Sequence, residues 1–299
     1  MASEDWQYSS HRCLIAFGIF DSNIGTQLSL IGVFDSGVGG LSILDEALRQ
    51  LPQHDYIYLA DSANAPYGEK SSDWIAKRSL SLCKHLAGAG CDAIVVACNT
   101  ATAEAIKQIR SEVKVPVIGV EPGIKPAAMQ SQNGIVGVLA TEATLKSDKF
   151  NALLATLPSD CRFIKQAGAG LVPLIEAGKA DSEETLELLA KHLVPIQDAG
   201  SDTLVLGCTH YPFLRKAIRK LLGESITLID TSEAVVRQLK RQLELIDAGC
   251  QSGKSAREHG SVSFISSKDD ATLLKMARDL MHSDLEAHEV SSSLLGATR

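Results

Sequence analysis

The sequence predicts an α/β protein with two pseudo-symmetric domains, mainly parallel sheets, and a ligand site in the cleft between the domains. Two observations carry this prediction. From residue 31 onward, short β-branched runs alternate with helical patterns, and two stretches of the chain resemble each other. The chain has 299 residues, which is enough for two domains of ordinary size.

The predicted strands are eight short apolar runs. They cover residues 31–34, 56–60, 93–97, 115–120, 135–140, 203–207, 226–229 and 262–265. Between them, apolar residues recur every three or four positions, as in Leu44, Leu48 and Leu51, which is typical of amphipathic helices. Strands that alternate with helices in this way favour parallel sheets.

The internal repeat places two cysteines at equivalent positions. The segment Ala89-Gly-Cys-Asp-Ala-Ile-Val-Val-Ala-Cys98-Asn-Thr matches Ala199-Gly-Ser-Asp-Thr-Leu-Val-Leu-Gly-Cys208-Thr-His in character. Ile31-Gly-Val-Phe-Asp-Ser36 likewise resembles Val136-Gly-Val-Leu-Ala-Thr141. Because ligands of such sheets bind beyond the carboxyl ends of the strands, we expect Cys98 and Cys208 to face one cleft.

Domain boundaries are predicted where these patterns break. The expected parts are an amino-terminal extension (1–29), a first domain (30–122 with 231–285), a second domain (123–230) and a frayed tail (286–299). The strand at 262–265 is expected to return to the sheet of the first domain.

Composition and charge exclude several classes of protein. The net charge of −7 argues against a non-specific grip on nucleic acid, which needs an excess of Lys and Arg. No apolar run approaches the roughly 20 residues that span a bilayer, and Glu4 and Asp5 stand where a secretory signal has basic residues. We therefore expect a cytoplasmic protein without a membrane partner. The seven cysteines include no C-x-x-C pair, so reduced thiols are expected and a structural zinc site is not.

Cys98 and Cys208 are the leading catalytic candidates. Either cysteine alone is more simply a buried core residue, but the repeat keeps a strand-end thiol in both halves while the neighbouring residues diverge. Moving a proton from one face of a carbon to the other requires two acid/base groups. The ordinary pKa of a thiol is roughly 8.5, so modest shifts of this pKa allow one thiolate and one thiol near neutral pH.

Asp35 and Ser36 open a glycine-rich segment, Asp35-Ser-Gly-Val-Gly-Gly40, between a strand and a helix. The segment lacks the G-x-G-x-x-G pattern of dinucleotide-binding loops. Two interpretations stay open, and both can hold together. The glycines permit a tight turn with Asp35 or Ser36 capping the helix, or Asp35 tunes a nearby thiol or binds a substrate ammonium group.

Other polar candidates are weaker when judged from the residues alone. Tyr67 and the Gly68 amide lie in a loop after a strand and are suited to binding a carboxylate. Glu176 follows an apolar stretch, and composition favours a solvent-exposed glutamate near a helix end. His210 lies two residues after Cys208, but a Cys-x-His pair has too few ligands for a zinc site.

Four motifs together resemble the glutamate racemase family. They are Val33-Phe-Asp-Ser-Gly-Val-Gly-Gly-Leu41, Pro66-Tyr-Gly68, Ala97-Cys-Asn-Thr-Ala101 and Gly207-Cys-Thr-His-Tyr-Pro212. Their order and spacing also match, and the resemblance covers residues 31–265. It implies two α/β domains related by pseudo-symmetry with the active site between them. It also implies a cofactor-independent isomerase that uses no pyridoxal phosphate and no metal, and whose D-glutamate enters peptidoglycan.

The resemblance also implies roles for individual residues. Cys98 and Cys208 are the catalytic pair. Asp35 assists Cys98. Glu176 and His210 assist Cys208. The residues expected to contact the substrate are Asp35, Ser36, Tyr67, Gly68, Asn99, Thr100, Thr209 and His210, together with Thr141 and Thr144, which hold its carboxylate.

The chain departs from many family members in two places. Asn64 stands where many of them carry an arginine, and no catalytic conclusion follows from it. The extension, together with the segment 121–128 that contains Lys125, resembles members that depend on an activator, UDP-N-acetylmuramoyl-L-alanine.

Alternatives to a glutamate racemase remain open at this point. A relative with the same two thiols acts on aspartate, hydantoins or maleate, although the motifs around Asp35 and Cys208 favour glutamate. A non-catalytic binding protein would have no reason to retain both Cys98 and Cys208. A role on another protein, and the choice between a monomer and a homodimer, are not indicated by the sequence.

Overall fold

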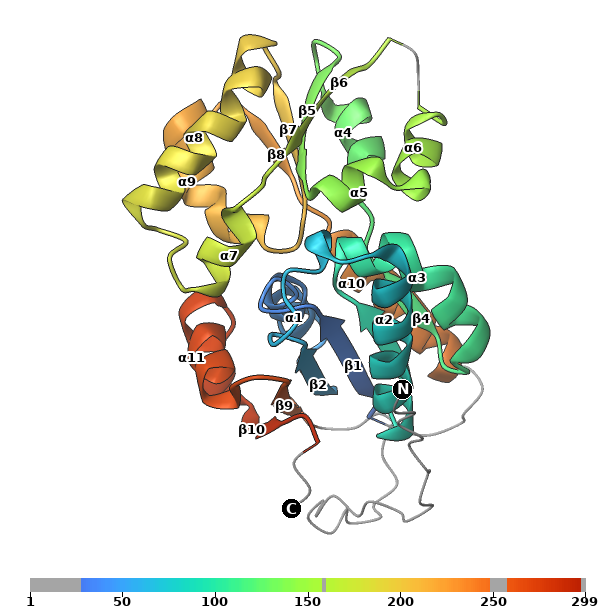
Figure 1. The fold of residues 1–299 in the computed structure, drawn as a ribbon. Coiled ribbons are helices and arrows are strands. Elements are labelled where there is room, and N and C mark those ends of the chain that lie inside the picture. The colour runs from blue at the N-terminus through green and yellow to red at the C-terminus, as the bar shows by residue number, and fades with distance from the viewer. Residues whose placement is uncertain (1–27, 158–159, 248–256, 297–299) are drawn as a thin grey trace, which may run out of the picture.

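A computed structural model describes residues 28–157, 160–247 and 257–296, so most of the amino-terminal extension lies outside the described residues. These residues form two α/β domains, each built on a parallel sheet (Figure 1). This confirms the predicted fold class. Within the described ranges, no helix is both long and apolar enough to cross a membrane.

The first domain contains a six-stranded sheet in the order β10-β9-β2-β1-β3-β4. Its strands are β1 (Leu30–Asp35), β2 (Asp55–Ala60), β3 (Ala93–Val96), β4 (Val117–Gly119), β9 (Ser261–Ser266) and β10 (Glu289–Leu294). Its helices are α1 (Leu41–Gln50), α2 (Ser72–Gly88), α3 (Asn99–Glu112), α10 (Ser232–Asp247) and α11 (Asp270–Leu280), with short 3₁₀ turns at Tyr67–Glu69 and Leu285–Ala287. Strands β1 to β3 are largely buried because helices cover them on both sides.

The second domain contains a four-stranded sheet in the order β6-β5-β7-β8. Its strands are β5 (Ile135–Ala140), β6 (Arg162–Ala167), β7 (Thr203–Gly207) and β8 (Thr227–Ile229). Its helices are α4 (Ile124–Gln130), α5 (Glu142–Lys146), α6 (Asp148–Leu154), α7 (Leu171–Glu176), α8 (Glu183–Asp198) and α9 (Arg215–Leu222), with a 3₁₀ turn at Tyr211–Leu214. The order β6-β5-β7-β8 reproduces the order β2-β1-β3-β4 of the first domain, which gives the sequence repeat a structural meaning.

One prediction about the chain end is wrong. Residues 289–294 are not part of a frayed tail, because they form β10, which pairs in parallel with β9. The strand sequence EVSSSL is polar and half-exposed, since β10 lies at the edge of the sheet. Such a strand lacks the apolar run by which the buried strands were predicted.

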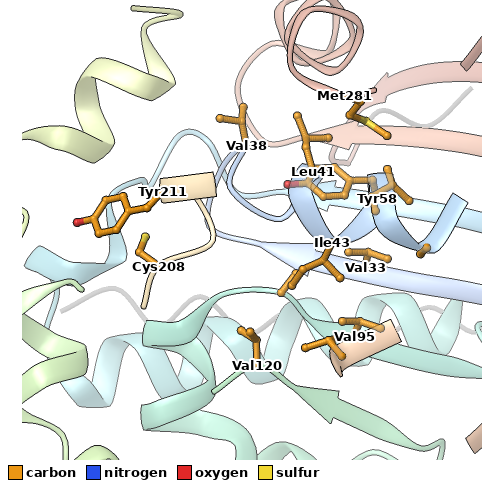
Figure 2. Packing of buried hydrophobic residues seen from close by; sticks show 14 of the residues in the cluster. Val33, Val38, Leu41, Ile43, Tyr58, Val95, Val120, Cys208, Tyr211 and Met281 are labelled. Carbon is orange, nitrogen blue, oxygen red and sulfur yellow. The ribbon is translucent and has the colours of Figure 1, made fainter. Parts of the chain in front are cut away.

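The hydrophobic core continues across the junction of the domains. One cluster of buried side chains includes Val33 and Val95 from the first sheet together with Cys208 and Tyr211 from the second domain (Figure 2). Packing of this kind removes apolar surface of both domains from water. The junction between the domains is therefore part of a shared core.

Candidate active site

The glycine-rich segment after β1 allows the two domains to approach each other closely. A methyl group on Gly37 would overlap the Glu176 carboxylate, and one on Gly39 would overlap the His210 ring. Both residues belong to the second domain. Gly40 is the N-cap of α1 and no side chain caps that helix, so the interpretation in which Asp35 or Ser36 caps it is wrong. The glycines serve as a contact surface for catalytic candidates of the other domain.

Cys98 lies two residues after the end of β3 and forms the N-cap of α3. Its Sγ accepts a hydrogen bond from the Ala101 N–H at 3.5 Å and lies 3.6 Å from Ser36 Oγ. Burial, and to a smaller extent the negative charge of Asp35, raise the pKa of the Cys98 thiol to about 12. Cys208 adds a smaller contribution in the same direction, which places the two thiols within electrostatic reach of each other.

Cys208 lies immediately beyond β7, at the position equivalent to Cys98. Its Sγ is 3.7 Å from Nδ1 of His210, and Nε2 of His210 is 2.6 Å from Oε1 of Glu176. Burial alone lowers the pKa of His210, but its contacts with Cys208 and Glu176 outweigh burial and raise that pKa well above the ordinary histidine value. The result is a row of three groups in which a protonated imidazole lies between sulfur and carboxylate.

Glu176 is the last residue of α7 and connects the domains. Its Oε1 also accepts a hydrogen bond from the Val38 N–H of the glycine-rich segment at 2.8 Å. Its side chain is only 17% exposed, so the expectation of a solvent-exposed glutamate is wrong. The short α7 was not among the predicted elements, and the sequence near Glu176 carries no sign of this contact with residue 38.

Asp35 is a fully buried carboxylate at the end of β1. It accepts hydrogen bonds from the Gly37 N–H at 2.8 Å and from the Thr209 hydroxyl at 3.3 Å. Burial raises the pKa of Asp35, and nearby His210 opposes this rise. Asp35 thus hydrogen-bonds to the segment that carries Cys208 and is close enough to Cys98 for its charge to affect that thiol, without a hydrogen bond to either sulfur among the described contacts.

Hydroxyl groups from both domains face one another on the side of Cys98. Oγ1 of Thr100 lies 3.1 Å from Oγ1 of Thr141, which in turn donates to Oγ1 of Thr144 at 2.8 Å. The Asn99 side-chain amide is buried, and in the described part of the chain it has no hydrogen-bond acceptor. Buried polar groups are normally hydrogen-bonded. An unpaired amide beside these hydroxyls is suited to a ligand with an oxygen atom.

Tyr67 and Gly68 lie in the 3₁₀ turn that follows β2. The Tyr67 hydroxyl donates to Asp61 at 2.7 Å. A methyl group on Gly68 would lie 3.4 Å from Cβ of Thr141, so this turn also borders the second domain. In the described ranges no three His, Cys, Asp or Glu side chains are grouped as metal ligands.

Each of the two parallel α/β domains carries a buried thiol just after an inner strand, next to polar side chains at the junction of the domains. This arrangement is typical of an α/β enzyme with its site between two domains. The chain matches the family model described as Asp/Glu/Hydantoin racemase over residues 31–239. It belongs to this family of racemases, and is therefore an isomerase.

Individual relatives agree with this assignment. The chain is 57% identical to the glutamate racemase of Ralstonia nicotianae over 213 residues, which cover 71% of this chain and 77% of that protein. It is 50% identical to the glutamate racemase of Cupriavidus pinatubonensis over 261 residues, or 87% and 94% of the two chains. Among solved structures, Escherichia coli glutamate racemase in complex with L-glutamate and the activator UDP-MurNAc-Ala is 32% identical, with a TM-score of 0.77. That comparison covers 90% of this chain and 98% of the E. coli chain.

Proposed function

We propose that the protein interconverts L- and D-glutamate, with Cys98 and Cys208 as the two acid/base groups. The observation that carries this proposal is that each domain has a buried thiol just after an equivalent strand, and that Cys208 is close enough to Cys98 for its charge to affect the Cys98 pKa. Relatives that are called glutamate racemases support the choice of substrate. The cytoplasmic location and the supply of D-glutamate for peptidoglycan and the cell wall are part of the same proposal.

The two thiols have different surroundings. Cys98 has a pKa raised to about 12 and is therefore a neutral thiol at pH 7, ready to deliver a proton. Cys208 has a basic partner instead, because its Sγ lies 3.7 Å from Nδ1 of His210, which in turn contacts Glu176. In the direction from L to D, the Cys208 thiolate removes the α-proton, and the Cys98 thiol protonates the opposite face of the carbanion. The reverse direction exchanges the two roles.

The remaining polar groups suit the ends of the amino acid. The α-carboxylate is proposed to lie against Thr141 and Thr144, with Asn99 and Thr100 as further donors. The ammonium group is proposed to lie beside Asp35, whose negative charge offsets it. Ser36, Thr209 and the Tyr67–Gly68 turn complete the expected contacts.

Solvent exchange tests the proposed reaction directly. Purified protein in deuterated water, with L-glutamate and no added cofactor, should produce D-glutamate that carries deuterium at the α-carbon. Circular dichroism follows the change of enantiomer, and proton NMR reports the label. Product that keeps its original hydrogen would contradict the two-base mechanism, and a requirement for a metal after dialysis against a chelator would contradict metal independence. Racemisation of aspartate or a hydantoin in place of glutamate would favour another member of the family.

The muramoyl nucleotide is proposed as an activator that favours the closed arrangement of the domains. The E. coli relative was solved with UDP-MurNAc-Ala as activator. In this chain Lys125 lies in α4, directly after the crossing from the first domain. A ligand shifts a conformational equilibrium only if it binds one arrangement more tightly. We expect the nucleotide to raise the racemisation rate of the full-length protein, and equal rates with and without it would refute this.

A further inference from the structure

A buried carboxylate that the proposed reaction does not use holds the Tyr67–Gly68 turn. Asp61 follows β2 directly, and its side chain is fully buried. Its backbone N–H donates to the Asp35 carbonyl oxygen at 3.0 Å, which ties the start of this loop to the end of β1. Asp61 therefore lies beside the site without belonging to its reacting groups.

The Asp61 carboxylate collects donors from the loop and from α2. The Tyr67 hydroxyl donates to Oδ2 at 2.7 Å, and Nδ2 of Asn64 donates at 3.1 Å. Arg78 of α2 donates twice, from Nε to Oδ2 at 2.9 Å and from Nη2 to Oδ1 at 2.6 Å. Burial alone raises the pKa of Asp61, but these donors outweigh burial and keep that pKa below its ordinary value. The carboxylate stays ionised, and its paired donors hold the loop in one conformation.

The same contacts fix where the turn faces. The Tyr67 ring packs edge-on against Trp74 with 5.3 Å between ring centroids. The Tyr67 hydroxyl donates its hydrogen to Asp61 and is not free to donate it to a substrate carboxylate. The role left for Tyr67 is to hold the turn. The neighbouring Gly68 faces Thr141 of the second domain, one of the hydroxyls proposed to hold the substrate.

We propose that Asp61 and Arg78 are positioning residues, whose ion pair places the Tyr67–Gly68 turn against Thr141 and thereby sets the affinity for glutamate. This inference rests on the proposed function. Asp61 and Arg78 themselves take no part in proton transfer. Removal of Arg78 leaves the buried Asp61 charge with neutral donors only, so the loop must rearrange to bring the carboxylate to water. The turn then no longer presents the same surface to the substrate.

The Michaelis constants of Arg78 variants test this inference. Arg78→Leu should raise KM for both enantiomers about tenfold, while kcat stays within about threefold of the wild-type value. Arg78→Lys keeps the charge but cannot donate in the bidentate manner, so its KM should lie between the KM of the wild type and that of Arg78→Leu. The matched control is Arg49→Leu, which removes an exposed ion pair with Glu46 on α1 and should leave both constants unchanged.

The division between KM and kcat separates positioning from mere stability. If Arg78 only stabilised the fold, its loss would reduce the fraction of active protein, so apparent kcat would fall while KM stayed at the wild-type value. That result, in the Leu variant or in the Lys variant where the Leu variant does not fold, would overturn the inference. Wild-type protein that does not racemise glutamate would instead overturn the proposed function, before any variant is compared.

Discussion

Serine in place of Cys98 or Cys208 should lower racemisation of glutamate by about 10³-fold or more in both directions, which is the usual scale of general acid–base catalysis. A serine hydroxyl is far too basic to exchange a proton at neutral pH, and each turnover uses both groups. Circular dichroism from either enantiomer gives the two rates. Cys161→Ser is the matched control, because this half-buried thiol contacts the Ala128 carbonyl group in the second domain, outside the site. Its activity should equal that of the wild type.

The same two variants separate the faces served by the thiols. A glutamate analogue with a leaving group on the β-carbon needs only one base, because elimination follows the first proton removal. Cys98→Ser should still eliminate from the L analogue through Cys208 and fail on the D analogue, and Cys208→Ser should show the reverse. Swapped preferences would reverse the assignment of faces. Loss of elimination from both enantiomers in both variants would contradict it altogether.

The sequence repeat predicted most of the fold but missed one strand of the second sheet. β6 (Arg162–Ala167) contains Lys165 and Gln166 and is half-exposed, because it lies at the edge of its sheet. A search for apolar runs cannot find such a strand. The repeat itself contained the missing signal, since β2 in the first half requires a partner in the second, and β6 occupies that place.

The site was predicted unevenly, for a physical reason. Cys98 and Cys208 follow buried strands, so local patterns place them at equivalent positions. Glu176 gains its role from contacts with His210 and with the amide of Val38, which is 138 residues away in sequence. No local pattern records a contact between domains, so only the family resemblance indicated this glutamate. The occupied hydroxyl of Tyr67 was hidden in the same way, because its partner depends on how the loop folds.

His210→Asn should slow elimination from the L analogue by about 100-fold, near the lower end of what assistance to proton transfer contributes, and should leave the D analogue near its wild-type rate. The His210 ring lies 3.7 Å from the Cys208 sulfur, and its raised pKa keeps it protonated at neutral pH. Asparagine can donate one neutral hydrogen bond but supplies no charge to a thiolate. Racemisation should fall equally in both directions as kcat/KM, since the equilibrium constant between enantiomers is one. Glu176→Gln should show the same preference with a smaller loss, because the imidazole remains.

His192→Asn provides the matched control for this prediction. His192 also accepts or donates hydrogen bonds at both ring nitrogens, with Gln166 and the Ala169 carbonyl oxygen, but it lies on α8 away from the thiols. The His192→Asn variant should catalyse elimination from both analogues at wild-type rates. Equal slowing on both enantiomers in His210→Asn would mean that His210 mainly holds the second domain against Gly39, where the two lie in contact. Slowing confined to the D analogue would instead mean that the imidazole assists Cys98. The 3.7 Å contact between His210 and Cys208 argues against that outcome.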